Sequence, residues 1–356
     1  DSQPYWWEAA PLATLPEAPV APGCDVVVVG AGYTGLSAAL TLARAGRSVQ
    51  VFDRQRPGEG ASSRNGGMAS GSIRPSVEEL TRRFGEGRAK GILYESKLAR
   101  EDLARLIRED GIDCDFVLSG RFTGAASPGA FEKQQREADM LRRELKIDAR
   151  AVPRAEQVAY IGTELYYGGL ARDDIGGLHP AKFHRGLLQA ALKAGVVVHG
   201  ETGVTSHAQQ GDGFSIATAR GPVQAKSLIM ATNGYTDGVD NWLRRRLVPV
   251  RSRMIATARH GASAPDLITA DSGAPWSSSI TTNARPSGAV PVSITSMMCG
   301  LPILLAENAS RRKRAIASVS CVYFSSIILI ATRLPRPMCS ASYTIPIPPR
   351  PSSRTI

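Results

Sequence analysis

The run from Cys24 to Asp53, CDVVVVGAGYTGLSAALTLARAGRSVQVFD, constrains the fold more than any other part of this 356-residue chain. Residues 25–29 form a short β-branched run, typical of a strand buried on both faces, which leads directly into the glycine-rich segment 30–35. The helix expected next has four apolar residues on one face: Leu36, Ala39, Leu40 and Ala43. Residues 48–52 follow as a second apolar strand. This order is that of a βαβ nucleotide-binding unit.

Three glycines and one acid in this unit point to a dinucleotide. Gly30 permits the tight turn out of the strand, Gly32 lets the backbone approach a pyrophosphate, and Gly35 lets the helix lie close to the strand. The helix then directs its N-terminal N–H groups and dipole at the phosphates. Asp53 lies about 20 residues past the glycines, where a carboxylate can accept both ribose hydroxyls. We predict a bound dinucleotide; the alternative is a glycine-rich turn in an unrelated α/β protein.

NAD and FAD proteins share this fingerprint, so the choice between them depends on later segments. Residues 58–68, GEGASSRNGGM, follow the second strand at once. Their glycines allow close backbone approach, while Ser62, Arg64 and Asn65 offer donors for a pyrophosphate or for the edges of a flavin ring. This loop favours FAD.

Two further segments agree with FAD, and together they carry a family resemblance. Residues 177–180, GLHP, lead into a helix, a strand and the segment ETGV at 201–204, and a last apolar run ends in ATNG at 231–234. In this order the segments resemble the FAD-dependent amine and amino-acid oxidoreductases of the D-amino-acid-oxidase fold, most of all the branch containing gamma-glutamylputrescine oxidoreductases. The resemblance covers residues 5–257.

The resemblance implies a fold and a set of cofactor-binding residues. It implies an α/β chain with a Rossmann-like FAD-binding domain of the glutathione-reductase type and an inserted, incomplete, mostly antiparallel substrate-domain sheet. The residues expected to bind FAD are Gly30, Gly32, Gly35, Asp53, Arg54, Ser62, Arg64, Asn65, Gly66, Gly67, Met68, Val204, Thr232, Asn233 and Gly234. Some relatives tether FAD through a histidine in the loop after the second strand. None of residues 63–65 is histidine here, so non-covalent FAD is expected.

The same resemblance implies the chemistry. A hydride passes from the carbon that bears an amine to flavin N5, the resulting imine hydrolyses, and molecular oxygen reoxidises the flavin. The protein supplies orientation, dry surroundings and the neutral amine, so a catalytic base is not obligatory and no catalytic residue is assigned. The expected partners are thus a small amine or amino-acid substrate and oxygen.

Two other interpretations of single residues stay open. An NAD(P)-dependent reductase could use Arg54 and Arg56 to grip a 2′-phosphate. His179 and His184 flank the start of a helix and could be catalytic, although a structural role in fixing the entry of that helix is favoured. Asp173 and Asp174 have no His or Cys at ligand spacing and are interpreted as a turn, so no metal site is expected.

The expected domains are discontinuous. An arm, 1–23, precedes an FAD-binding domain formed by 24–112 and 176–240, with substrate-domain pieces at 113–175 and 241–258. Helices are expected over residues 76–109, where Gly85, Gly87 and Gly91 are candidate interruptions, and over 129–145 and 180–194. Strands are expected over residues 116–122, 165–170, 196–198, 214–219 and 225–231. Five prolines exclude a long helix in the arm, which is expected to lie extended on the surface, anchored by Tyr5–Trp7 or covering an apolar pocket with them.

The composition changes abruptly near residue 258. Residues 261–356 are rich in Ser, Pro, Arg and Ile and contain nine Arg and Lys against three Asp and Glu. We interpret 259–356 as an aberrant, poorly ordered tail that is translated out of frame; the alternative is a divergent extension with its own role. If the tail is aberrant, this polypeptide can be an inactive remnant of an oxidoreductase.

Charge and cysteine content bear on partners and location. The formal charge is +11, but much of it lies in the tail, and the basic runs 244–246 and 311–314 lack interleaved aromatics, so no nucleic-acid partner is expected. The five cysteines are odd in number, widely spaced and without a CxxC pair, which favours a reducing compartment. The apolar run 319–331 is too short to span a membrane. We expect a cytoplasmic protein; its oligomeric state is not predicted.

Overall fold

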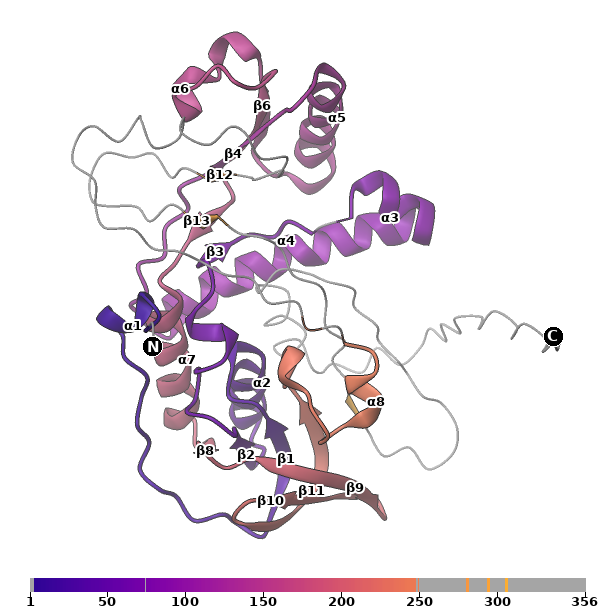
Figure 1. Ribbon diagram of the computed structural model, residues 1–356. Helices are drawn as coiled ribbons and strands as arrows, with labels where there is room; N and C mark the ends of the chain where they lie inside the picture. Colours follow the sequence, from indigo (N-terminus) through magenta and orange to yellow (C-terminus); the bar gives the residue numbers. More distant parts are fainter. Residues whose placement is uncertain are drawn as a thin grey trace, which may run out of the picture.

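The computed structural model describes residues 3–73, 75–247 and 249, together with the backbone of three short strands nearer the C-terminus. These strands are β12 (Ile280–Thr281), β13 (Ser293–Ile294) and β14 (Leu305–Ala306). Most of the tail expected to be aberrant, including Cys299, Cys321, Cys339 and the run 319–331, lies outside the described residues. Figure 1 shows a large sheet flanked by α2 and α7, a smaller sheet beside α5, and the long helix α4 running between these two regions.

The large sheet is mixed, and its parallel part forms the nucleotide-binding unit. Its strands in spatial order are β8 (Val197–His199), β2 (Val49–Phe52), β1 (Gly23–Val29), β11 (Gly221–Met230), β10 (Gly213–Thr218) and β9 (Val204–Gln210), with β14 pairing on β11. The first four are parallel neighbours, while β10 and β9 form an antiparallel hairpin on the first half of β11. The parallel βαβ order predicted from the sequence is therefore confirmed.

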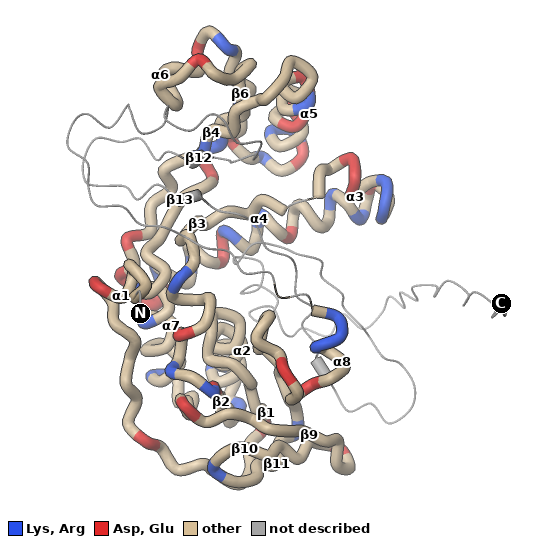
Figure 2. Tube along the Cα trace, in the orientation of Figure 1, with Lys and Arg blue, Asp and Glu red and all other residues tan. Residues whose placement is uncertain are grey.

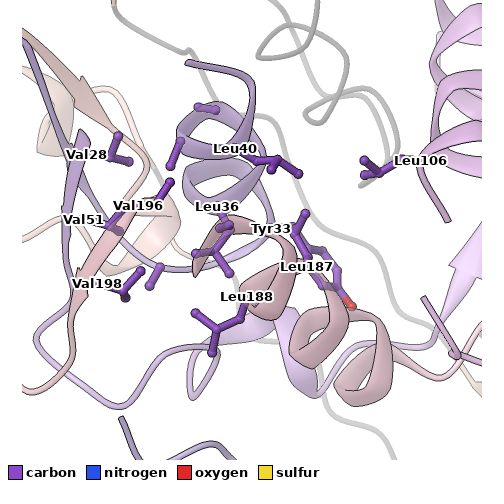
Figure 3. Close-up of a cluster of buried hydrophobic side chains, with 14 of the residues drawn as sticks. Val28, Tyr33, Leu36, Leu40, Val51, Leu106, Leu187, Leu188, Val196 and Val198 are labelled. Atoms are coloured by element: carbon purple, nitrogen blue, oxygen red, sulfur yellow. The ribbon is translucent and has the colours of Figure 1, made fainter. Parts of the chain in front are cut away.

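Strand β1 is buried on both faces, as its continuous valine run predicts. Val26 and Val28 pack in a cluster with α2 (Tyr33–Arg44) and α7 (Pro180–Lys193). The intervening Val27 and Val29 pack in a second cluster with β10 and β11. Figure 3 shows side chains of the first cluster converging between strands and helices: Val28, Leu36, Leu40, Val51, Leu187, Leu188, Val196 and Val198. Burial on both sides fixes the register of β1 and the position of the turn that follows it.

The remaining elements form the outer helices and the small sheets. The helices are α1 (Trp6–Ala9), α3 (Val77–Phe84), α4 (Glu86–Glu109), α5 (Pro128–Leu145), α6 (Val158–Ile161) and α8 (Asn241–Arg244). An antiparallel sheet has the order β4 (Arg121–Gly124), β6 (Gly169–Arg172) and β5 (Ala149–Val152). A two-stranded sheet pairs β3 (Met68–Ala69) with β7 (Gly176–Gly177). The antiparallel sheet falls within the expected substrate-domain piece, and the division into domains stays a prediction.

Several expected boundaries are corrected by the structure. The helical region 76–109 is broken at Gly85, whose φ of 78° ends α3, whereas Gly87 and Gly91 remain within α4. Ser76 caps α3 by accepting from the N–H of Glu79. The strand expected at 116–122 starts only at Arg121, and the strand expected at 165–170 lies instead at 169–172. The ends of these two strands are set by the pairing of β4 with β6. Local β-propensity does not show which residues pair, so the sequence could not place the ends.

The N-terminal arm is not extended throughout, contrary to expectation. Residues 6–9 form a helical turn, and Trp7 packs with Ala10 and Ala181 in a small buried cluster. Residues 11–21, which contain three of the five prolines, are without regular structure. Trp7 is only 9% exposed, so it is packed against the protein, as both predicted roles of the aromatic residues require.

Charged residues of both signs share the outer helices (Figure 2). Ion pairs one helical turn apart stabilise these surfaces, among them Arg83 with Glu79 and Lys90 with Glu86. Within the described part of the chain, no helix has both the length and the apolar character needed to cross a membrane.

Candidate cofactor-binding site

A cavity of about 120 Å³, partly open to solvent, lies at the carboxyl ends of the parallel strands. Two hydrogen bonds join these strand ends: the N–H of Gly30 donates to the carbonyl of Phe52 (2.7 Å), and the N–H of Ala231 donates to Val29 (2.8 Å). The cavity is lined by residues 29, 30 and 32–34 of the first turn, 52–55, 58 and 60–62 after β2, Val204, and residues 231–233, 235, 237 and 239 after β11. This is where α/β sheets bind ligands.

The glycine turn is shaped by backbone contacts that no larger residue would permit. Gly30 has a φ of 108°, and a Cβ atom there would lie 2.6 Å from the carbonyl oxygen of Ala231. At Gly35 a Cβ atom would lie 1.8 Å from the carbonyl oxygen of Gly30. Helix α2 therefore lies against the turn as the sequence predicts, and its first residues, 33 and 34, form part of the cavity wall. The N–H groups and dipole of a helix start suit a phosphate.

Asp53 lies at the end of β2 and faces both the turn and the cavity. Its Oδ2 accepts from the N–H of Ala31 (2.7 Å) and its Oδ1 accepts from the N–H of Gln55 (2.9 Å). Desolvation by burial raises the pKa of this carboxyl above its usual value, although the two backbone donors act in the opposite direction. Each carboxylate oxygen can accept a further hydrogen bond, so Asp53 can bind ribose hydroxyls while it holds the turn.

Ser62 connects the second loop to the start of α2. Its Oγ accepts from the N–H of Tyr33 (3.0 Å), and a Cβ atom on Gly32 would lie 2.8 Å from that same oxygen. Gly32 therefore makes room for the Ser62 hydroxyl as well as for a ligand. The contact places a hydroxyl beside the N-terminal amides of the helix, where a pyrophosphate is expected to bind.

The opposite wall comes from the residues after β8 and β11. Val204, the first residue of β9, lines the cavity together with Thr232 and Asn233. Asn233 adopts a φ of 52°, and its Oδ1 accepts from the N–H of Gly234, which is not among the lining residues. Arg54 is at the rim and forms an exposed ion pair with Asp237.

Seven of the predicted cofactor-binding residues do not line this cavity: Gly35 and Gly234, which adjoin lining residues, and five in the loop after β2. Arg64, Asn65, Gly66, Gly67 and Met68 lie along the far part of the loop. The Arg64 guanidinium stacks 4.7 Å from the ring centroid of Trp7, the side-chain amide of Asn65 donates to the Ser62 carbonyl, and Met68 pairs with Gly177 in the two-stranded sheet. Their expected contact with pyrophosphate and flavin stays a prediction.

Several lining residues were not predicted from the sequence. Among them are Thr34, Gln55, Tyr235, Asp237 and Val239. Thr34 and Gln55 adjoin predicted residues, so their position next to the turn and to Asp53 could have indicated them. Tyr235, Asp237 and Val239 follow the last parallel strand at irregular spacing, and no sequence signal identifies them.

The histidines that could have been catalytic have structural partners. His179 caps α7 by accepting from the N–H of Lys182 through Nδ1 (3.2 Å), and desolvation lowers its pKa. His184 is buried and its Nε2 contacts the carbonyl oxygen of Ala31 (2.8 Å). Burial lowers the pKa of His184 to about 4, so the neutral ring donates to this carbonyl near pH 7. The favoured structural interpretation is consistent with both environments.

The residues of the cavity fit the adenosine and pyrophosphate part of FAD. The glycine turn gives backbone access, the start of α2 gives N–H groups, Asp53 gives a buried acceptor, and Val204 gives an apolar contact. A buried acceptor beside a positively polarised helix start matches a ribose next to a phosphate.

Comparisons with known proteins agree with this geometry. The sequence profile of the family described as FAD dependent oxidoreductase matches residues 25–289. The chain is 29% identical over 268 residues to a probable oxidoreductase, OrdL, of Haemophilus influenzae, which covers 72% of this chain and 59% of that protein. It is 32% identical over 255 residues to gamma-glutamylputrescine oxidoreductase of Escherichia coli, which covers 70% of this chain and 58% of that protein.

A solved structure with a similar fold is glycine oxidase from Geobacillus kaustophilus. The TM-score is 0.52 at 22% identity, and the match covers 60% of this chain and 56% of that one. L-amino acid deaminase from Proteus myxofaciens matches with a TM-score of 0.53 at 19% identity, covering 62% and 48%. At these identities the likeness shows the fold alone. The chain spans less than two thirds of the length of the curated relatives named above.

Proposed function

The chain belongs to the family of FAD dependent oxidoreductases, and on that premise we propose that it binds FAD non-covalently and oxidises a C–N bond of a small amine or amino acid. The observation that supports this proposal best is the single cavity that unites the glycine turn, Asp53, Ser62, Val204 and the segment after β11. These parts come from four separate regions of the sequence. Their meeting at one edge of the sheet is expected of a dinucleotide site.

In the proposed site each part of the chain has one task. The turn and the start of α2 bind the pyrophosphate, next to the Ser62 hydroxyl, which accepts from the N–H of Tyr33. Asp53 binds the ribose and, through its contact with the N–H of Ala31, keeps the turn in place. Val204 contacts the adenine. The residues from Arg64 to Met68 lead away from the cavity and lie along the flavin end of the cofactor.

When bound, FAD supplies a hydride acceptor, and the proposed reaction removes a hydride from the carbon that bears the amine, leaving an imine that water hydrolyses. Oxygen is the proposed final acceptor and the cytoplasm the proposed location. The chain contributes orientation and exclusion of water. The substrates in the names of related proteins suggest where to search: gamma-glutamylputrescine, glycine and L-amino acids.

The proposal is tested with the purified full chain. We expect flavin absorption bands, either at once or after incubation with FAD and gel filtration, and bleaching of these bands without air by at least one member of a panel of amines and amino acids. Readmission of air should restore the bands. A chain that stays colourless after incubation with FAD would remove the proposed cofactor. Bands that no amine bleaches would leave a flavin-binding protein without the proposed activity, as expected of an inactive remnant.

The alternative of an NADP-dependent reductase has less support. It would require Arg54 and Arg56 to be available for a 2′-phosphate. Arg54 pairs with Asp237, and Arg56 pairs with Glu59 at 3.2 Å. Binding of NADPH more tightly than FAD in the same titration would reverse this preference.

A further inference from the structure

The N-terminal arm reaches the cavity wall through a chain of buried hydrogen bonds. The indole N–H of Trp7 donates to the Oγ of Ser63 (2.7 Å), and the Ser63 hydroxyl donates to the carbonyl of Gly58 (2.7 Å). Ser63 is fully buried. Gly58 is itself part of the cavity wall, whereas Trp7 and Ser63 are not among the lining residues. Trp7 of the arm is thus linked to the cavity wall at Gly58 through the side chain of Ser63.

The same glycine is held from its other side by α7. Gly58 has a φ of 84°, and a Cβ atom there would lie 2.5 Å from the ring of His184. That ring donates through Nε2 to the carbonyl of Ala31 in the glycine turn (2.8 Å). Gly58 is therefore confined between the arm and the helix, and the contacts continue to the turn expected to bind the pyrophosphate.

A second tryptophan fastens the loop further along. The indole N–H of Trp6 donates to the carbonyl of Asn65 (2.9 Å), and its ring packs edge to face on His179, with 4.8 Å between centroids. The Arg64 guanidinium covers the ring of Trp7. Figure 1 shows α1 beside α7, next to the start of this loop. The two tryptophans thus contact the loop at residues 63, 64 and 65.

We propose that Trp7 and Ser63 are positioning residues for the cofactor, and that the arm belongs to the cofactor-binding unit. They hold residues 58–65 in the conformation that forms the cavity wall. The inference rests on the proposed binding of FAD. An arm that is merely anchored to a finished surface would contribute to overall stability, yet it would change neither the affinity for FAD nor the exposure of the loop.

The first experiment is a titration of the full chain with FAD, followed by flavin fluorescence. Trp7→Phe keeps a smaller aromatic ring and removes the donor, and Ser63→Ala removes only the middle hydroxyl. We expect each to raise the Kd for FAD about fivefold to tenfold, the scale of one buried hydrogen bond. The double variant should be no weaker than the weaker single variant, because both changes break one chain. Tyr94→Phe, on the exposed face of α4, is the matched control and should bind like the wild type.

The second experiment needs no cofactor and separates this inference from the proposed function. In residues 57–74 the only bond that trypsin can cleave is Arg64–Asn65, because Pro75 follows Arg74. We expect cleavage of the apoprotein at this bond at least about threefold faster in Trp7→Phe and Ser63→Ala than in the wild type or Tyr94→Phe. If the wild type binds no FAD, the proposed function fails and the cleavage rates still decide whether the arm orders the loop.

The inference is overturned by either of two results. One is a wild type that binds FAD with both single variants within twofold of its Kd. The other is equal cleavage at Arg64 in wild type and variants. If Trp7→Phe does not fold, the FAD titration and the cleavage rate are both measured on Ser63→Ala, because that substitution removes only one hydroxyl group.

Discussion

The two segments that wall the cavity are built in different ways. The turn at 30–35 is fixed by glycines, whose missing side chains allow backbone atoms to approach within distances that a Cβ atom would forbid. The loop at 58–65 is fixed by side chains from elsewhere, chiefly Trp7 and His184. The conformation of the turn is therefore determined by its own residues. The conformation of the loop depends on contacts between residues that lie 50 or more positions apart in the sequence.

This difference predicts how each segment fails. A substitution in the turn should cause a steric clash that the fold cannot relieve, because the opposing atoms belong to the backbone. A substitution in the loop contacts should remove one interaction and leave the fold intact. The predictions below test that distinction, beginning with the largest effect.

Gly35→Ala should be the most damaging change. Its new methyl group would meet the Gly30 carbonyl oxygen at 1.8 Å and Val28 Cγ1 at 3.2 Å, so α2 must shift away from β1. We expect a loss of about 3 kcal/mol or more in the free energy of unfolding, measured with urea in the absence of FAD. Gly91→Ala is the matched control: nothing lies within 4 Å of its added methyl, and it should stabilise α4 by about 0.5–1 kcal/mol. A Gly35→Ala protein as stable as the wild type would refute the steric account.

His184, which links the two segments, predicts a pH dependence. Its pKa is lowered to about 4 in the folded state, mainly by desolvation, from an ordinary 6.5, so the unfolded chain binds a proton at this site first as the pH falls. The free energy of unfolding is therefore unaffected by this group above pH 6.5. Between pH 6.5 and pH 4 protonation of His184 in the unfolded chain lowers it by roughly 3 kcal/mol. His184→Gln should flatten the profile by that amount in urea unfolding between these pH values. A slope that remains reflects His179 and His199, whose pKa values are also lowered by desolvation. An unchanged slope in the variant would contradict the assignment.

Asp53→Ala should weaken FAD binding about tenfold to a hundredfold, because it removes the buried acceptor for the ribose and frees the N–H of Ala31. Asp53→Asn, which keeps one carbonyl oxygen, should lose less. The Kd is measured by flavin fluorescence, with circular dichroism to verify the fold. Asp139→Asn on the exposed side of α5, outside the cavity, is the control, and its effect should be small. Equal affinity of Asp53→Ala and wild type would exclude Asp53 from the binding site.

Trp6→Phe should have the smallest effect of the four. It removes one partly buried hydrogen bond, to the Asn65 carbonyl, and keeps the ring against His179. We expect a loss of about 1 kcal/mol in the free energy of unfolding by urea. Tyr5→Phe, whose side chain is exposed, should stay within about 0.5 kcal/mol of the wild type. If Trp6→Phe lowered the free energy of unfolding as much as Gly35→Ala does, the proposed difference between the turn at 30–35 and the loop at 58–65 would be wrong.

The accuracy of the sequence predictions follows the same division. The βαβ unit, the three glycines and Asp53 were recognisable because each acts through its own backbone or through a neighbour fixed by the strand register. The residues from Arg64 to Met68 were assigned to the cofactor with the others, yet none of them lines the cavity. Tyr235 and Val239 were missed, because the path of the chain after β11 brings them to the wall and no periodicity marks them.

By itself the sequence determined that parallel strands meet at a glycine turn, that a helix start and an acid lie beside that turn, and that the chain belongs with FAD oxidoreductases. These features are encoded locally, in backbone sterics and hydrophobic pattern, over about 30 residues. Only the tertiary structure decided that a tryptophan in the arm holds Ser63 and that His184 lies between Gly58 and Ala31. Such contacts join residues far apart in the chain, and their partners are chosen by how the elements pack.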